Sequence, residues 1–223
     1  MDNIMFDLYG TLIDINTDES KDVFWESFCE NTKKYKVYDY LDLKAKYLLK
    51  CEELHKLKEE IELLDVFKYL FECDEIVAKE IALIFRKLST KYIKKYRGVD
   101  KLLMYLKEKG CKIYLLSNAQ ASFTIPEMLD LDLVKYFDGI AISSDYGVKK
   151  PNKDFYLKAM ESYGITSENT WMVGNDYECD IYPANKLGLK TIYIESNLSP
   201  DRLKVEKIKG FSFRKVKKAF KFK

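Results

Sequence analysis

The chain has 223 residues, of which 47% are hydrophobic and 33% are charged, and its formal net charge is +2. This length can bury one core of ordinary size, or a core with a smaller second domain. The balanced charge excludes a general attraction to nucleic acid or to a membrane surface, and no apolar run approaches the roughly 20 residues that span a bilayer.

Cysteine usage and the first residues predict a cytoplasmic protein. The start, Met1-Asp2-Asn3, lacks the positive charge that opens a secretion signal. No two of the five cysteines form a CxxC pair, and such a scattered, odd number predicts reduced thiols. The single histidine, His55, lies among charged residues typical of a helix surface, which argues against a histidine-rich metal site and against a Ser-His-Asp triad.

The first predicted strand is Asn3–Leu8, an apolar run that carries Asp7 near its end. A Gly10-Thr11 turn follows at once. A carboxylate is costly inside a core, but the end of a buried strand holds a side chain rigidly at the edge of a sheet. Asp7 is therefore the candidate nucleophile.

The next stretch, from Asn16 to Tyr96, is helical in character. It contains no Pro or Gly and no clear strand pattern, and it has helical spacing in Asp42–Lys58 and Asp74–Lys95. One apolar helix face is predicted from Ile76, Ile81, Leu83, Ile84, Leu88 and Tyr92. We predict that residues 16–96 form a helical cap domain, inserted after the first strand into a core of residues 1–15 and 97–223. The alternative is a long helical excursion packed directly on the sheet.

Strands and helices alternate through the rest of the chain. The further predicted strands are Lys112–Ser117, Gly139–Ser143, Thr170–Gly174 and Lys190–Glu195. The helices expected between them are Asp100–Lys109, Lys153–Tyr163 and Asp180–Leu187, with Gly110, Gly164 and Gly188 as C-caps. This alternation predicts an α/β fold, with a Rossmann-like parallel sheet, helices on both faces and right-handed crossovers.

The tail from Lys204 to Lys223 is strongly basic. Such a run can mark a contact with RNA or with an anionic membrane. We favour a solvated amphipathic last helix whose inner face is formed by Val216, Ala219 and Phe220. No nucleic-acid or membrane partner is expected.

Polar side chains follow four of the predicted strands at the point where each strand ends. In chain order they are Asp7, Ser117, Asn118, Lys150, Asn175, Asp176 and Asp180. Any one of these is a weak signal, because Ser-Asn and Lys-Pro are common in turns and Asp commonly caps a helix. In an open parallel sheet the ligand crevice lies beyond the carboxyl ends of the strands, so all seven are predicted to share one crevice.

The same four runs resemble, in the same order, the four motifs of the haloacid dehalogenase superfamily, over about residues 3–195. The resemblance implies a catalytic role for Asp7 as the nucleophile, with Thr11 and Ser117 hydrogen-bonding the nucleophile or the anion. It also implies that Asn118 orients the substrate and that Lys150 balances negative charge. The helical insert resembles the cap that selects the substrate in this superfamily.

The resemblance further implies a Mg²⁺ cofactor. Magnesium takes few carboxylates and keeps several waters. Asp7, the main-chain carbonyl of Tyr9 and Asp176 would suffice as protein ligands, with Asp180 or Asn175 held through water. Which of Asn175 and Asp176 stands in the usual ligand position is left open.

The residue at position 9 distinguishes between two possible reactions, phosphate-ester hydrolysis and dehalogenation. Most phosphatases of the superfamily carry a second aspartate there, which protonates the leaving alkoxide and then activates water. Tyrosine has an ordinary pKa of about 10 and is a poor substitute. The Asp-x-Tyr-Gly-Thr form is that of the 2-haloacid dehalogenases, whose halide leaves without a proton. Tyr156, six residues beyond Lys150, also matches a tyrosine that those enzymes place in the site and is a candidate substrate-binding residue.

Two features favour a phosphatase instead. The dehalogenases grip their substrate with an arginine early in the cap, and no arginine occurs here between Leu12 and Phe85. Their fourth motif is also less acidic and holds no metal. The preferred interpretation is Mg²⁺-dependent hydrolysis of a small phosphorylated compound. The alternatives are metal-independent 2-haloacid dehalogenation and a non-catalytic anion-binding protein.

Overall fold

The computed structural model describes residues 2–200 and 204–220. Met1 of the N-terminus and Lys221 and Lys223 of the predicted basic tail lie outside them. Six strands form a parallel sheet in the order β5-β4-β1-β6-β7-β8. They are β1 (Asn3–Phe6), β4 (Lys112–Ser117), β5 (Gly139–Ile142), β6 (Thr170–Gly174), β7 (Lys190–Glu195) and β8 (Ile208–Lys209). The predicted α/β fold with a Rossmann-like parallel sheet is confirmed.

Helices cover both faces of this sheet. The side chains of β1 alternate, so that Ile4 and Phe6 pack towards α5 and α10 while Met5 packs towards α8 and α9. Burial on both faces explains why the strands are continuous apolar runs. The helices of this part are α5 (Val99–Glu108), α6 (Ala121–Asp130), α7 (Ser143–Tyr146), α8 (Lys153–Tyr163), α9 (Tyr182–Lys186) and α10 (Phe213–Ala219). The shorter turns are η1 (Val134–Tyr136), η2 (Ser167–Asn169) and η3 (Tyr177–Ile181).

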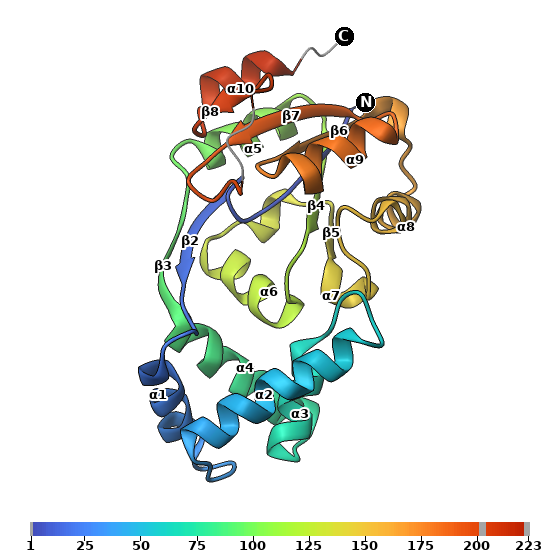
Figure 1. Cartoon of the computed structure of the whole chain (residues 1–223). Coiled ribbons are helices and arrows are strands. Elements are labelled where there is room, and N and C mark those ends of the chain that lie inside the picture. The colour runs from blue at the N-terminus through green and yellow to red at the C-terminus, as the bar shows by residue number, and fades with distance from the viewer. Residues whose placement is uncertain (1, 201–203, 221–223) are drawn as a thin grey trace.

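Four helices gather at one end of the molecule and join the rest through β2 and β3 (Figure 1). They are α1 (Asp22–Thr32), α2 (Tyr40–His55), α3 (Leu63–Phe71) and α4 (Glu75–Ser89). The linking strands, β2 (Ile13–Thr17) and β3 (Thr90–Lys95), form a separate antiparallel pair. The four helices bury their aromatic residues mainly against one another, and α6 adds only Phe123 to that cluster. The predicted cap limits, residues 16–96, fall within β2 and just after β3, and they stay a prediction.

Two predictions for this segment are wrong. The expected helix Asp74–Lys95 ends at Ser89, and a strand follows it. β-Branched and aromatic residues crowd this end of the segment, and Ile93 pairs with Ile15 of β2, so the strand wins over the helix. The apolar face of α4 is also different, because Ile76 is 72% exposed and Leu83 is 46% exposed. Ile81 of the predicted face is buried as expected, but its buried companions are Ala78, Ala82 and Phe85, and the small alanines allow close packing on the neighbouring helices.

The ends of the described chain agree with the remaining predictions. Val216 and Phe220 are buried, and Ala219 packs beside them, so α10 is the expected amphipathic helix. His55 is exposed at the end of α2, and all five cysteines are free thiols. Over residues 2–200 and 204–220, no helix combines the length and the apolar character needed to cross a bilayer.

Candidate active site

Asp7 lies directly beyond β1, the strand between β4 and β6 in the sheet. Its main-chain N–H donates to the Val173 carbonyl at 2.9 Å, which extends the pairing of β1 with β6. Its carboxylate is held from two sides: Lys150 Nζ lies 2.9 Å from Oδ1, and Thr11 Oγ1 donates to Oδ2 at 3.0 Å. The side chain is therefore fixed in one orientation at the carboxyl edge of the sheet.

Lys150 is the cation at the centre of the site, and its side chain is only 2% exposed. Its ammonium also lies 2.7 Å from Asp180 Oδ1 and donates to the Leu116 carbonyl at 2.8 Å. Burial by itself would lower the pKa of Lys150, but the charges of Asp180 and Asp7 outweigh burial and raise the pKa above its ordinary value. The lysine is thus a permanent positive charge beside Asp7.

Asn118 fixes the main chain of Lys150. Its amide nitrogen donates to the Lys150 carbonyl at 2.8 Å, and its amide oxygen accepts from the Lys150 N–H at 2.8 Å. Because the amide is engaged in this pair of hydrogen bonds, Asn118 positions the lysine as well as facing the crevice.

Asp180 and Tyr156 hold the main chain that follows β6, next to the site. Asp180 Oδ2 accepts the N–H groups of Asn175 and Asp176, each at 3.0 Å. Burial raises the pKa of Asp180, and Lys150 offsets this only in part. The Tyr156 hydroxyl donates to the Cys179 carbonyl at 2.5 Å, and the side chain is completely buried. Because none of its surface is exposed, Tyr156 is not placed to make the predicted contact with the substrate. Its hydroxyl instead holds η3 in place.

Asn175 brings a fourth polar group to Asp7. The terminal amide atom that faces Asp7 lies 3.1 Å from Asp7 Oδ2, 3.2 Å from Thr11 Oγ1 and 3.0 Å from the Tyr9 carbonyl oxygen. The hydrogen-bonding environment favours a nitrogen at this position, because it can donate to all three oxygens, and the amide would have to turn over to place its oxygen there. An oxygen there completes a cluster of ligand atoms, since an octahedral Mg²⁺ with oxygens at about 2.1 Å holds neighbouring oxygens about 3 Å apart. The residues present therefore fit the ion.

Gly10 allows this approach. It has a φ of 87°, and a Cβ built on it would lie 2.3 Å from the Asn175 amide nitrogen. Only glycine combines this backbone conformation with the space that Asn175 occupies.

The acidic metal site stays a prediction, and the contacts of its carboxylates are as follows. Asp176 Oδ1 accepts the N–H of Cys179 at 3.0 Å, so its side chain caps η3. The oxygens of Asp180 face Lys150 and the main chain. In the part of the chain that the structure describes, no group of three or more His, Cys, Asp or Glu side chains is arranged to hold a metal ion. Asp7 and the Tyr9 carbonyl lie together around the Asn175 amide, and the ligand roles of Asp176 and Asp180 stay predictions.

The Tyr9 side chain points to α6. Its hydroxyl donates to Glu127 Oε2 at 2.5 Å and lies 3.0 Å from Thr124 Oγ1. Burial and the neighbouring Glu127 carboxylate raise the pKa of Tyr9 above its ordinary value. A hydroxyl bound in this way, with its pKa raised, is a poor proton donor, as expected for tyrosine at this position. The role of the Tyr9 carbonyl as a metal ligand stays a prediction.

Ser117 leaves one buried hydroxyl unused. It ends β4, it is fully buried, and its Oγ finds no hydrogen-bond partner among the residues described. Buried polar groups are almost always paired, so an orphan at the edge of a ligand crevice calls for a ligand atom.

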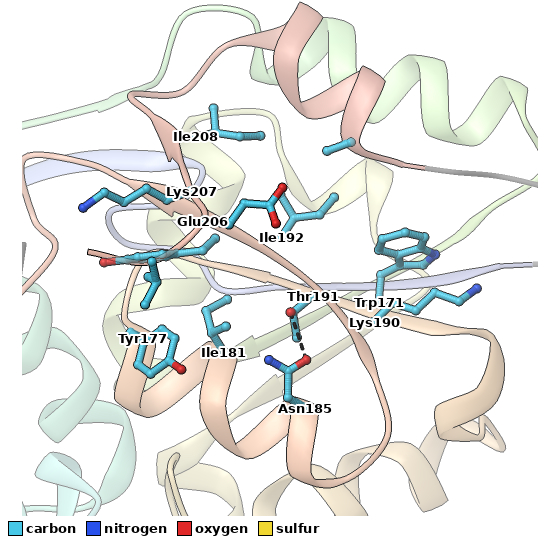
Figure 2. A pocket seen from close by; sticks show the side chains of 13 residues that line it. Trp171, Tyr177, Ile181, Asn185, Lys190, Thr191, Ile192, Glu206, Lys207 and Ile208 are labelled. Atoms are coloured by element: carbon cyan, nitrogen blue, oxygen red, sulfur yellow. Dashed lines mark hydrogen bonds between the residues drawn. The ribbon is translucent and has the colours of Figure 1, made fainter. Parts of the chain in front are cut away.

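A pocket of about 300 Å³ adjoins these residues and is lined in part by Tyr9, Asn118 and Arg86. Figure 2 shows a second hollow of about 530 Å³ beside β7, with Trp171 and Lys190 towards one end and Lys207 towards the other. None of the predicted site residues lines this second hollow, so the smaller pocket is the one that belongs to the site.

Sequence reasoning missed Arg86 and Glu127. Arg86 comes from α4 and reaches the main body, where its Nε lies 2.5 Å from Glu127 Oε1. One signal in the sequence points to it: Arg86 is the first arginine in the chain, directly after the arginine-free stretch that ends at Phe85.

Comparison with known proteins identifies the family. The sequence model of the haloacid dehalogenase-like hydrolases matches residues 4–194. The chain belongs to this family. The predicted membership and the prediction of a hydrolase are therefore confirmed.

Individual relatives differ in how much of the chain they match. A phosphoglycolate phosphatase of Aquifex aeolicus is 30% identical over 191 residues, which are 84% of this chain and 82% of that protein. A glyceraldehyde 3-phosphate phosphatase of Pyrococcus abyssi is 28% identical over 104 residues, or 47% of this chain, and the match spans only 44% of that relative's length. The crystal structure of a 2-haloacid dehalogenase from Pseudomonas syringae pv. Tomato DC3000 has a TM-score of 0.65 at 19% identity, covering 98% of both chains. That likeness shows a shared fold only.

Proposed function

We propose that the protein is a Mg²⁺-dependent phosphatase of a small phosphorylated compound, with Asp7 as the nucleophile. The observation that carries the proposal is the surroundings of the Asp7 carboxylate. One of its oxygens contacts Lys150, and the other lies 3.1 Å from the Asn175 amide group, which is itself 3.0 Å from the Tyr9 carbonyl oxygen. The names of two relatives, a phosphoglycolate phosphatase and a glyceraldehyde 3-phosphate phosphatase, support the same reaction class.

In the proposed reaction a carboxylate oxygen of Asp7 attacks phosphorus, and the bond from phosphorus to the leaving oxygen breaks with its electron pair. Water then attacks the resulting acyl phosphate and releases inorganic phosphate and the free Asp7 carboxylate. Lys150 stabilises the negative charge of the transferring group, and the Ser117 hydroxyl donates to one of its oxygens. Magnesium bound at Asp7, the Tyr9 carbonyl and the Asn175 amide oxygen would supply further neutralising charge.

The leaving group receives no proton from Tyr9 in this scheme, because that hydroxyl is bound to Glu127. Substrates whose leaving oxygen is a weak base, such as aryl or acyl phosphates, should therefore be hydrolysed faster than simple alkyl phosphates.

A second candidate is 2-haloacid dehalogenation without metal. The tyrosine in the first motif favours it, since halide departs without a proton. The proposed ester on Asp7 would then form by displacement of halide from carbon, and water would hydrolyse it.

One screen separates the candidates. Purified protein is assayed with p-nitrophenyl phosphate, acetyl phosphate, alkyl phosphates and 2-haloacids, each with millimolar Mg²⁺ and with chelator. Magnesium-dependent release of phosphate supports the first proposal, whereas halide release in chelator supports the second. Turnover of neither class would favour a non-catalytic anion-binding protein.

Asp7→Asn is the matched control, because it removes the charge of the nucleophile with little change in volume. We expect less than a few per cent of wild-type turnover with an unchanged circular dichroism spectrum. Substantial residual turnover in a folded variant would show that Asp7 is not the nucleophile.

A further inference from the structure

The pocket beside the site has one charged residue in its wall. Its volume is about 300 Å³, and it is lined by Tyr9 and Asn118 next to the proposed reaction centre, by Phe123 and Thr124 of α6, and by Arg86 of α4. The other residues of the described chain that line it are uncharged. Because Tyr9 follows Asp7 closely and Asn118 directly follows Ser117, a substrate that transfers its phosphoryl group to Asp7 would place its remainder here.

Arg86 is held rigidly in that wall. Its Nε lies 2.5 Å from Glu127 Oε1, and its guanidinium carbon lies 5.7 Å from the centre of the Tyr9 ring and 5.2 Å from that of Phe123. Its side chain is 20% exposed. A cation fixed by packing and by a paired carboxylate loses little freedom when it binds a ligand.

Glu127 does not line this pocket. It lines a separate hollow, to which Arg86 also contributes, and there it lies with Pro126 and Asp130 of α6. The carboxylate therefore binds the guanidinium away from the pocket, through Nε and Nη2. Since a guanidinium has five N–H donors, these contacts leave further donors for a second anion.

We propose that Arg86 binds a second anionic group on the substrate, a carboxylate or a phosphate. The substrate class is then short phosphorylated compounds that carry such a group beyond the hydrolysed phosphoryl group. The planar guanidinium fork matches both anions in a bidentate geometry. This inference rests on the proposed phosphatase function and assigns specificity to a residue that connects the helices α1–α4 with the main body.

The test compares each substrate between variants, so that differences in leaving group cancel. The value of kcat/KM is measured for 2-phosphoglycolate, for pyrophosphate and for ethyl phosphate, which has no second anion. Arg86→Gln should lower kcat/KM for one or both acidic substrates about 30-fold or more, mainly through KM, and for ethyl phosphate less than about threefold. A loss on 2-phosphoglycolate alone identifies a carboxylate, and a loss on pyrophosphate alone identifies a phosphate.

Glu127→Gln is the matched control, since it removes the same ion pair but keeps the guanidinium. Because the pair also holds the guanidinium in place, Glu127→Gln should lower kcat/KM for the acidic substrates, but less than Arg86→Gln does. Arg86→Lys, which keeps the charge without the fork, should fall between wild type and Arg86→Gln. If Arg86 only joins the two parts of the molecule, both Arg86→Gln and Glu127→Gln will lower turnover of all three substrates equally, and the proposal is wrong. If wild type hydrolyses ethyl phosphate but Arg86→Gln shows no selective loss on the acidic substrates, only the Arg86 assignment is wrong. If wild type hydrolyses none of the phosphates, the proposed function is wrong as well.

Discussion

At the scale of single residues, the side chain and the main-chain carbonyl of Tyr9 lie in different surroundings and should have different roles. The hydroxyl is bound to Glu127 and Thr124, while the carbonyl oxygen lies 3.0 Å from the Asn175 amide that faces Asp7. Tyr9→Phe should therefore leave kcat within about threefold of wild type and lower the free energy of unfolding by about 1.5–3 kcal/mol, the value of a hydrogen bond to a charged group. Steady-state rates and urea unfolding measure both. A loss of about 10²-fold in kcat would instead assign proton transfer to the hydroxyl.

Two neighbouring residues should differ in their effect on metal binding. Asn175 faces Asp7, whereas Asp176 caps η3. Millimolar Mg²⁺ should raise the melting temperature of wild type, since a ligand of the folded state stabilises it. Asn175→Ala should abolish this shift. Asp176→Ala should keep the shift but cost about 1 kcal/mol of stability as a lost cap. The reverse pattern, measured by thermal melts with Mg²⁺ and with chelator, would return the ligand role to Asp176.

At the scale of elements, the loop between α2 and α3 is fastened to the loop after β4. Gln120 accepts from the Leu63 N–H at 2.8 Å and donates to the Ile61 carbonyl at 2.9 Å. Gln120→Ala should free this loop, which would raise KM several-fold and speed cleavage by trypsin at Lys58. Lys149→Ala is the comparison, because it removes one ion pair of the same loop, between Lys149, 38% exposed, and Glu60, 10% exposed. It leaves both main-chain contacts of Gln120 and should raise KM less than Gln120→Ala does. Equal proteolysis of wild type and Gln120→Ala would contradict a fastening role.

At the scale of the whole molecule, there are separate apolar clusters on the two sides of β2 and β3. Phe28 lies at the centre of the cluster of α1–α4, in contact with the rings of Phe24, Phe67 and Phe85. Phe28→Ala should cost these helices about 3–5 kcal/mol. Hydrogen exchange should then lose protection in α1–α4 while β1, β4 and β6 keep theirs, as expected if residues 16–96 form a domain. Uniform loss across both parts would mean one cooperative unit.

The sequence by itself determined the parallel sheet, the order of the reactive residues along it and the family, because strand periodicity and strand-end motifs are local patterns. Asp7 and Lys150 meet as expected, since both follow strands that end at the same edge. Tertiary structure alone decided where Tyr9 points and that Arg86 reaches the crevice, because both depend on how α6 packs on residues more than 40 positions away in the chain. It also turned Asn175 towards Asp7 and Asp176 towards the main chain of η3, which neighbouring positions in one turn do not reveal. Local sequence patterns identify the candidate groups. Packing between residues far apart in the chain determines which of their atoms come within hydrogen-bonding distance.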